Sequence, residues 1–390
     1  MKKRFALGAA CLAFGAGNAR AVPYQDVLLA AVPEYNGRMT EGVALYGSLD
    51  MGINYQTVGG RSLWQTQSGG EWTSKFGFFG RENLGGGWRA EFNLESGFLA
   101  NSGAQQDAQS TYNRQSWVGL SSDSYGRLRL GKQIGTALPL FIDVFGTVGT
   151  NSVYTWLGAA AVQTSRGVGY NSDLGPGATQ LPARVDNAIT YRTPIVAGTT
   201  SLMLMFAPSN VAGRAPVASA QGALLQWYNG TTYLAASYNQ VWGVNGASTV
   251  RNDLYGLGAV YDTGRIVLSA SFNQYAPKLA GDGIARVYTL GAIVPFGVNA
   301  IRASVVYRDT SGVRDAAGQP ARDSALGAML GYDYLLSKRT GLYARAGFIR
   351  NYGISTVLLN GNPLPTEPGG TTPRTGTTPV TLSLGMYHNF

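Results

Sequence analysis

The last ten residues of the chain alternate between two kinds of side chain and end on an aromatic ring. Leu382, Leu384, Met386, His388 and Phe390 fall on one face of an extended strand, with small or polar residues between them. Successive residues of a strand point to opposite sides, so this segment has one apolar and one polar face. A closing strand of this kind, with a ring at its end, is typical of barrels in a bacterial outer membrane.

The N-terminus has the pattern of an export signal. Residues 1–5 are mostly basic, residues 6–17 are apolar, and Ala19-Arg20-Ala21 supplies the small residues of a cleavage site. We therefore expect residues 1–21 to be a signal peptide that is removed. Its loss takes away Cys11, the only cysteine, and lowers the formal charge from +9 to +5, because 30 − 4 = 26 basic groups then face 21 acidic ones. So small an excess, without runs of Lys or Arg, gives no support for nucleic acid as a partner.

Composition separates the two classes of membrane protein. The chain has 54 Gly and 22 Tyr, is only 13% charged, and has a mean hydropathy of −0.03. A helical membrane protein would carry apolar runs of about 18 residues or more, and none follows the signal. In a barrel strand, apolar residues that face lipid alternate with polar residues that face water, so the mean hydropathy of the chain is close to zero.

About sixteen alternating segments follow Val43, joined by connections that are short and long in turn. This predicts an all-β fold, a transmembrane antiparallel β-barrel of 16 strands over residues 43–390, preceded by an extension of unknown role at residues 22–42. The predicted tight turns are 82–87, 121–126, 194–198, 228–231, 262–264, 295–297 and 336–340. The predicted long loops are 56–70, 99–110, 135–183, 241–251, 310–322 and 353–378.

An even number of strands places both termini at the same, periplasmic, end. The connection 135–183 is too long for a structureless surface loop, so we expect it to fold inside the lumen. Aromatic residues near strand ends are expected to form the girdles at the two membrane interfaces: Trp72, Trp88, Trp117, Trp227, Tyr191 and Tyr233. A soluble β-sandwich or β-repeat protein is the alternative. It is disfavoured because it does not explain the many aromatic residues near strand ends or the terminal Phe390.

Several motifs, taken in order, resemble a known family. They are Ser74-Lys-Phe-Gly-Phe-Phe-Gly-Arg-Glu-Asn-Leu-Gly-Gly-Gly87, Glu91-Phe-Asn-Leu-Glu-Ser-Gly-Phe98, Asn113-Arg-Gln-Ser-Trp-Val-Gly-Leu120, Gly126-Arg-Leu-Arg-Leu-Gly-Lys-Gln133, Asp186-Asn-Ala-Ile-Thr-Tyr191 and the terminal Tyr-His-Asn-Phe. Together they resemble the general trimeric porins of Gram-negative bacteria, in their β-proteobacterial form. The resemblance covers nearly everything from Val43 to Phe390.

The resemblance implies a sixteen-stranded barrel whose third long loop folds inward and narrows the pore. By motif position, Lys75, Arg114 and Arg184 resemble the family's basic ladder, and Asp143 resembles the acid of the loop. Alternation also predicts that the three basic side chains point into the lumen, because each is out of phase with apolar neighbours. Glu91 is the acid expected to touch the ladder, since its strand neighbours that of Lys75. The other lumen charges predicted by alternation are Arg89, Glu95, Arg129, Asp186, Arg302, Arg308 and Arg345.

The family also implies a homotrimer in outer-membrane lipid, inserted by the barrel assembly machinery with Phe390 as the C-terminal assembly signal. Its implied function is passive diffusion of small hydrophilic solutes and ions, with no cofactor, no metal and no catalytic residue. A porin specific for a sugar or an anion is the first alternative. An outer-membrane hydrolase is the second, disfavoured because His388 is the only histidine.

The predicted charges set an expectation for ion preference. Three basic wall groups face one identifiable loop acid, and charges act over about a Debye length, roughly 10 Å at 0.1 M salt. Where enteric relatives place a further basic residue, this chain has Ser48, and residues 137–141 lack a second acid. The sequence therefore predicts a weak preference for anions.

Overall fold

The structure is a computed structural model. It describes residues 41–390 except 109, 138, 140–141, 146–162, 165–166, 169–183, 210–211, 214, 217–218, 246–247, 278–282 and 358–374. The predicted signal peptide and residues 22–40 of the predicted extension lie outside the described residues. No helix in the described part of the chain is long and apolar enough to cross a membrane.

The described secondary structure is a succession of strands. Their bounds are β1 Gly42–Val58, β2 Arg61–Ser68, β3 Lys75–Gly85, β4 Trp88–Gly97, β5 Gln115–Ser122, β6 Gly126–Ile134, β7 Gln163–Thr164, β8 Gly167–Val168, β9 Arg184–Arg192, β10 Thr200–Ala207, β11 Ala220–Tyr228, β12 Thr232–Asn245, β13 Ser248–Asp262, β14 Val267–Pro277, β15 Ile284–Phe296, β16 Asn299–Ser311, β17 Asp323–Leu335, β18 Thr340–Gly353 and β19 Val380–Asn389. All except the short pair β7 and β8 belong to one antiparallel sheet.

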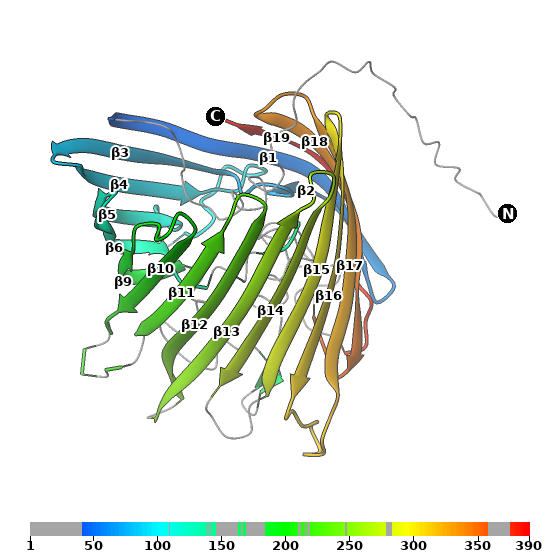
Figure 1. The fold of residues 1–390 in the computed structure, drawn as a ribbon. Helices are drawn as coiled ribbons and strands as arrows, with labels where there is room; N and C mark the ends of the chain where they lie inside the picture. Colours follow the sequence, from blue (N-terminus) through cyan, green and yellow to red (C-terminus); the bar gives the residue numbers. More distant parts are fainter. Residues whose placement is uncertain are drawn as a thin grey trace.

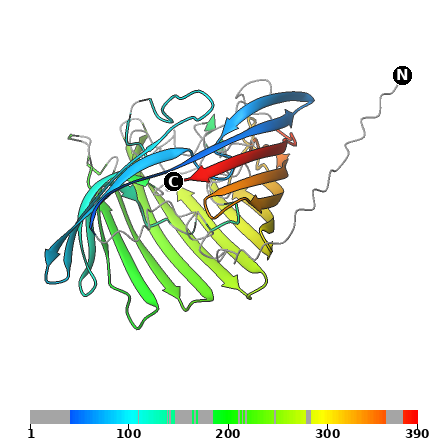
Figure 2. The ribbon, with the colours of Figure 1, turned by 90° about the horizontal axis from the view of Figure 1, so that it is seen from above.

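The sheet closes into a barrel, shown from the side in Figure 1 and from above in Figure 2. It contains 17 strand segments, and β1 pairs with β19 to close it. The first half of β1 pairs with β3 and the second half with β2, so β2 and β3 are two parts of one barrel strand. Counting them together gives 17 − 1 = 16 strands, which confirms the predicted fold.

The last residue takes part in this closure. The Phe390 N–H donates to the Gly47 carbonyl at 3.0 Å, and the Gly47 N–H donates to the Phe390 carbonyl at 3.0 Å. The pairing continues the ladder between β1 and β19, in which Ser48 faces Asn389. The terminal aromatic therefore occupies the seam, at the end of the barrel where β1 begins.

The two faces of the wall have opposite chemistry. Leucines such as Leu204, Leu257 and Leu384 are exposed on the outside, while the inward phase carries asparagines, serines and charged groups. This distribution suits lipid outside and water inside. The girdle prediction requires outward side chains, and Trp88, Trp227 and Tyr191 meet this requirement. The prediction was wrong for Trp72, Trp117 and Tyr233, which turn inward. The Trp117 ring stacks against the guanidinium of Arg129, which points into the lumen, and Tyr233 is buried among other inward side chains. Trp72 lies in the break between β2 and β3.

The turns follow the predicted asymmetry. All seven predicted tight turns join consecutive strands at the end where β1 begins and β19 ends. The connections between β10 and β11, β12 and β13, β14 and β15, and β16 and β17 lie at the other end, seen at the bottom of Figure 1. Two predicted loops were wrong. Residues 56–70 form a hairpin around Gly59 and Gly60, and residues 241–251 mostly continue β12 and β13. Glycines at positive φ allow the chain to reverse in two residues, so β1 and β2 extend farther than their polarity indicates.

Candidate pore constriction

Glu95 is the centre of a buried charge site on the inner wall. Its carboxylate lies 3.1 Å from Lys75 Nζ and 2.7 Å from Arg114 Nε, and it accepts a hydrogen bond from the Tyr46 hydroxyl at 3.0 Å. The four side chains come from β1, β3, β4 and the residue that precedes β5. A buried carboxylate is stable only when paired and hydrogen-bonded, and these contacts meet that need.

The register of the β3–β4 hairpin explains why Glu95 is the partner. Lys75 lies opposite Gly97, so the nearest inward carboxylate on β4 is Glu95, two residues away. Glu91 lies opposite Arg81 and pairs with it at 2.7 Å. The predicted contact between Glu91 and the basic ladder was therefore wrong.

Arg184 joins the same site through electrostatics. It is the first residue of β9, it is half-buried, and it lies close enough to Glu95 and Lys75 to interact with both charges. The structure thus brings together the three predicted ladder residues, Lys75, Arg114 and Arg184, around one acid. Their role at the narrowest point of the pore stays a prediction.

A second charge cluster lies on the inner wall near the seam. It consists of Glu71, Arg302, Asp333 and Arg345, called here the seam cluster. Arg302 lies 2.8 Å from Glu71 and 2.5 Å from Asp333, and Arg345 pairs with the same two carboxylates. Two cations and two anions give a neutral cluster that joins β16, β17 and β18 to the segment between β2 and β3.

The Glu71 side of this cluster is positioned by Asp50. One oxygen of the Asp50 carboxylate accepts the backbone N–H groups of Glu71 and Trp72, both at 2.7 Å, and the other accepts the Tyr343 hydroxyl at 2.8 Å. These bonds hold residues 69–74 as a short inward turn between β2 and β3. The barrel strand is interrupted there, and the interruption brings Glu71 to the two arginines.

The first part of the long loop 135–183 is attached to the inner wall by hydrogen bonds. Arg302 donates from Nη1 to the Val144 carbonyl at 2.8 Å, and Ser304 donates to the Asp143 carboxylate at 2.6 Å. The Arg345 guanidinium lies 5.3 Å from the centre of the Phe145 ring. The seam cluster and β16 therefore hold residues 143–145, while most of the loop lies outside the described residues.

The wall is shaped to receive this segment. A Cβ at Gly291 would lie 2.7 Å from Val144 Cγ1, and a Cβ at Gly331 would lie 2.8 Å from Phe145 Cε1. Any side chain at these positions would overlap the loop. Glycine here serves close approach between backbone and loop.

Asp143 lies at the wall and its described contacts are with the wall. Its carboxylate accepts the Ser304 hydroxyl and, at 3.3 Å, the Phe145 N–H. Burial raises the pKa of the Asp143 carboxyl to about 6, although these hydrogen bonds and nearby Arg302 act in the opposite direction. No contact with Lys75, Arg114 or Arg184 is present among the described side chains, so an opposition across the pore stays a prediction.

The remaining predicted lumen charges fall into three settings. Arg129 stacks on Trp117 with 3.9 Å from its guanidinium carbon to the ring centre, and Arg308 lies 3.8 Å from Asp323; both point inward. Arg89 has the inward phase but lies at the rim, where it pairs with Asp123 at 2.6 Å and lowers the pKa of that carboxyl.

Asp186 does not face the lumen, so its assignment was wrong. It is half-exposed and pairs at 2.7 Å with Lys132, which shares the outward phase of Leu128 and Leu130. Asn187 has a φ of +53°, and the pairing of β6 with β9 shifts register beside it. This bulge directly follows Asp186 and turns its side chain away from the lumen.

Known proteins with similar sequences are outer-membrane porins, which is consistent with the barrel and its charged inner wall. The family model of the Gram-negative porins matches residues 8–353. The chain belongs to the Gram-negative porin family. An outer-membrane porin of Bordetella pertussis is 28% identical over 367 residues, covering 80% of this chain and 89% of that protein. Outer membrane porin protein 32 of Delftia acidovorans is 29% identical over 358 residues, covering 89% and 94%.

Solved structures show the same barrel. The anion-selective porin from Comamonas acidovorans superposes with a TM-score of 0.74 at 26% identity, covering 90% of this chain and all of that one. OmpF of Salmonella typhi, at 16% identity and a TM-score of 0.62, supports the fold alone. This porin therefore forms a water-filled channel for passive diffusion of small hydrophilic solutes across the outer membrane.

Two acids of this porin were not predicted as site residues. Asp333 is out of phase with the outward Tyr332, so alternation could have placed it in the lumen. Glu71 follows Gly69 and Gly70, and these paired glycines are the signal for a break in the strand. Its partners on β16 and β18 are more than 200 positions away along the chain and have no local signature.

Proposed function

We propose that this porin conducts small ions and polar solutes with a weak preference for anions. One observation carries the proposal: in two ion pairs of the β3–β4 wall, the cation is the more exposed partner and the carboxylate is buried. Lys75 is 14% exposed and its partner Glu95 is 0% exposed, and Arg81 is 25% exposed where its partner Glu91 is 4% exposed. A passing ion meets the cations at shorter range.

The charge balance of the Glu95 site supports the same sign. Lys75, Arg114 and Arg184 against Glu95 give 3 − 1 = +2 on one wall, whereas the seam cluster is neutral. Asp143 and Asp50 add negative charge near the seam cluster, but each is buried and hydrogen-bonded. Fixed charges of opposite sign on different walls also produce a field that orients dipolar solutes, so we expect polar molecules to pass more easily than apolar ones. The similarity to an anion-selective porin adds support.

The test is the zero-current potential in a potassium chloride gradient across a planar bilayer. Arg114→Glu and Arg184→Glu should each shift it toward cation preference. Arg265→Glu is the matched control, because it makes the same charge change on an exposed hairpin between β13 and β14. A clearly cation-selective wild type, or a shift as large in the control, would refute the assignment of these residues to the constriction.

The same recordings separate a general channel from a specific one. Conductance that rises in proportion to salt supports the general porin. Saturation with salt, or block by one sugar or organic anion, would favour the substrate-specific alternative.

We also propose the processing and assembly of the chain. Residues 1–21 are removed on export, the mature chain forms a homotrimer, and Phe390 directs insertion by the assembly machinery. Mass spectrometry of the purified protein should give an N-terminus at Val22 and a trimeric mass in mild detergent. His388 is exposed at the rim and contacts the Thr340 hydroxyl at 2.8 Å, which supports a structural role rather than hydrolysis.

A further inference from the structure

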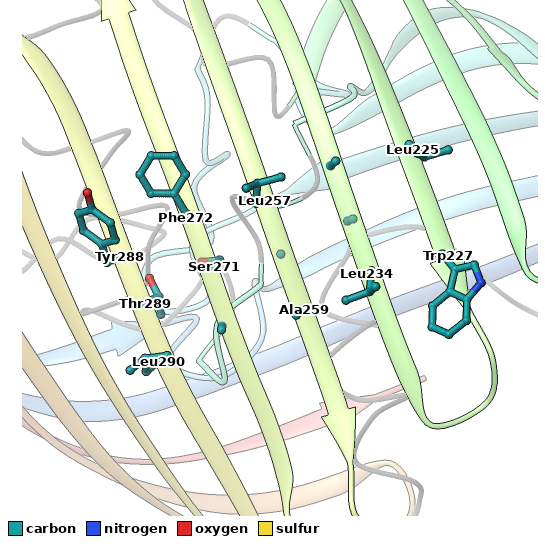
Figure 3. Close-up of a pocket in the computed structure, with 14 residues that line it drawn as sticks. Leu225, Trp227, Leu234, Leu257, Ala259, Ser271, Phe272, Tyr288, Thr289 and Leu290 are labelled. Atoms are coloured by element: carbon teal, nitrogen blue, oxygen red, sulfur yellow. The ribbon is translucent and has the colours of Figure 1, made fainter.

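The outside of the barrel carries an apolar groove over β11–β15. It has a volume of about 700 Å³ and a floor that includes Ala236, Ala259 and Ala270. Larger side chains stand around this floor, as Figure 3 shows: Leu225, Trp227, Leu234, Leu257, Phe272, Tyr288 and Leu290. Ala259 lies directly opposite Ala270 in the β13–β14 pairing, so two small residues meet where the neighbouring positions are large.

A polar row borders the groove on the side of the long loops. Phe272 and Tyr288 are opposite each other, with ring centres 5.2 Å apart. The next outward pair is Gln274 and Arg286, joined by a hydrogen bond of 3.0 Å. Two residues along a strand correspond to about 7 Å. The cationic side chain of Arg286 therefore begins about 7 Å from the aromatic edge of the apolar groove, a distance that a lipid headgroup can span.

The row continues across the next three strands. Arg286 faces Asp309, Asp309 faces Ser324, and Ser324 faces Tyr352. These positions lie just beyond the aromatic residues Phe272, Tyr288 and Tyr307, where a membrane protein meets the headgroup layer.

Two more arginines extend the row at Tyr352. The guanidinium carbons of Arg322 and Arg350 lie 4.5 Å and 5.3 Å from the centre of its ring. Among the described residues neither arginine forms an ion pair with a carboxylate, and the Arg322 side chain donates from Nε to the Ser324 hydroxyl at 2.8 Å. With Arg286 against Asp309, the row carries 3 − 1 = +2 charges on the outside of the barrel.

We propose that this face binds a phosphorylated lipid of the outer leaflet, with an acyl chain in the groove and its phosphate at Arg286, the arginine of the row that lies on a groove strand, while Arg322 and Arg350 add positive charge farther along the row. The charge of the row selects the headgroup, and its position beside the groove requires a ligand with both parts. Arginine suits this ligand because its planar guanidinium binds phosphate oxygens in pairs.

The probe is dioleoylphosphatidic acid added to the purified full-length porin in dodecyl maltoside, with bound lipid counted by native mass spectrometry. Dioleoylglycerol has the same chains without phosphate and should bind weakly. A cationic side chain near a lipid phosphate contributes about 5-fold in affinity, so Arg286→Gln should weaken binding by about that factor. Arg350→Gln, three strands away from Arg286, should weaken binding by less. Asp309→Asn should strengthen binding by about 5-fold.

A further variant tests the role of the groove. Ala259→Phe fills the floor from the lipid side and should weaken phosphatidic acid binding while Arg265→Gln, at the other end of the barrel, leaves it unchanged. Circular dichroism of each variant checks that the barrel is folded.

Three results would overturn the proposal. Equal binding of dioleoylglycerol would show an apolar surface without headgroup recognition. Full competition by inorganic phosphate at millimolar concentration would show a free-anion site. A change of oligomeric mass in Ala259→Phe, with lipid binding intact, would show that the groove is a contact between copies of the chain.

Discussion

Glu95 offers the sharpest test of the inner wall, because one buried carboxylate there pairs with two cations. Glu95→Gln keeps the shape of the side chain and removes the charge, leaving Lys75 and Arg114 beside each other with no acid in contact. Removing one partner of a buried ion pair costs about 3–5 kcal/mol. We expect the free energy of unfolding to fall by roughly that amount, measured by guanidinium unfolding in neutral detergent with tryptophan fluorescence.

Glu91→Gln is the matched control on the same strand. Its partner Arg81 is partly exposed and can turn toward the lumen, so the expected loss is about 1 kcal/mol or less. The two variants should also differ in conduction, since Glu95→Gln adds a net positive charge among the ladder residues and should increase anion preference. Equal destabilisation by the two variants would refute the claim that the ladder depends on Glu95.

Three further predictions concern the loop and the seam. The pKa of the Asp143 carboxyl is raised to about 6, so this group takes up a proton as the pH falls from 7.5 to 5 and the pore loses a negative charge. Anion preference should therefore rise over this range. Asp143→Asn should abolish the change. Gly291→Val should displace Val144 from the wall and alter single-channel conductance, whereas a valine at outward Ala292 should have no effect. Deleting Phe390 removes both hydrogen bonds to Gly47, so the amount of heat-resistant folded protein in outer membranes should fall.

The fold could be predicted because barrel strands have a local signature. Alternation identifies the inward and outward faces, and all the tight turns except residues 336–340 contain glycine, asparagine or aspartate. The hairpin of residues 56–70 was missed because its strands are polar, although Gly59-Gly60 between them is a turn signal.

The candidate site was predicted in part, and the errors have two physical causes. Alternation alone does not give register: the β3–β4 pairing shifts by one residue between Asn83 and Gly85, and only with this shift does Lys75 lie opposite Gly97, next to Glu95. A bulge also changes the phase without a strong signature, which is why Asp186 was placed on the wrong face.

The contacts of the seam cluster join residues that are far apart along the chain, so no local sequence pattern predicts them. Glycine inside a strand costs about 0.5–1 kcal/mol relative to alanine, so the glycines at 291 and 331 make the barrel wall weaker unless something else occupies their space. The loop segment 143–145 fills that space, and Arg302 and Arg345 hold it there while they also bind Glu71 from the break between β2 and β3. The interrupted strand, the glycine wall and the inward loop segment thus depend on one another. Exchanging Glu71 for Gln should consequently disturb the loop as well as the break, with a change in conductance that Asp123→Asn, which removes a carboxylate paired only at the rim, does not produce.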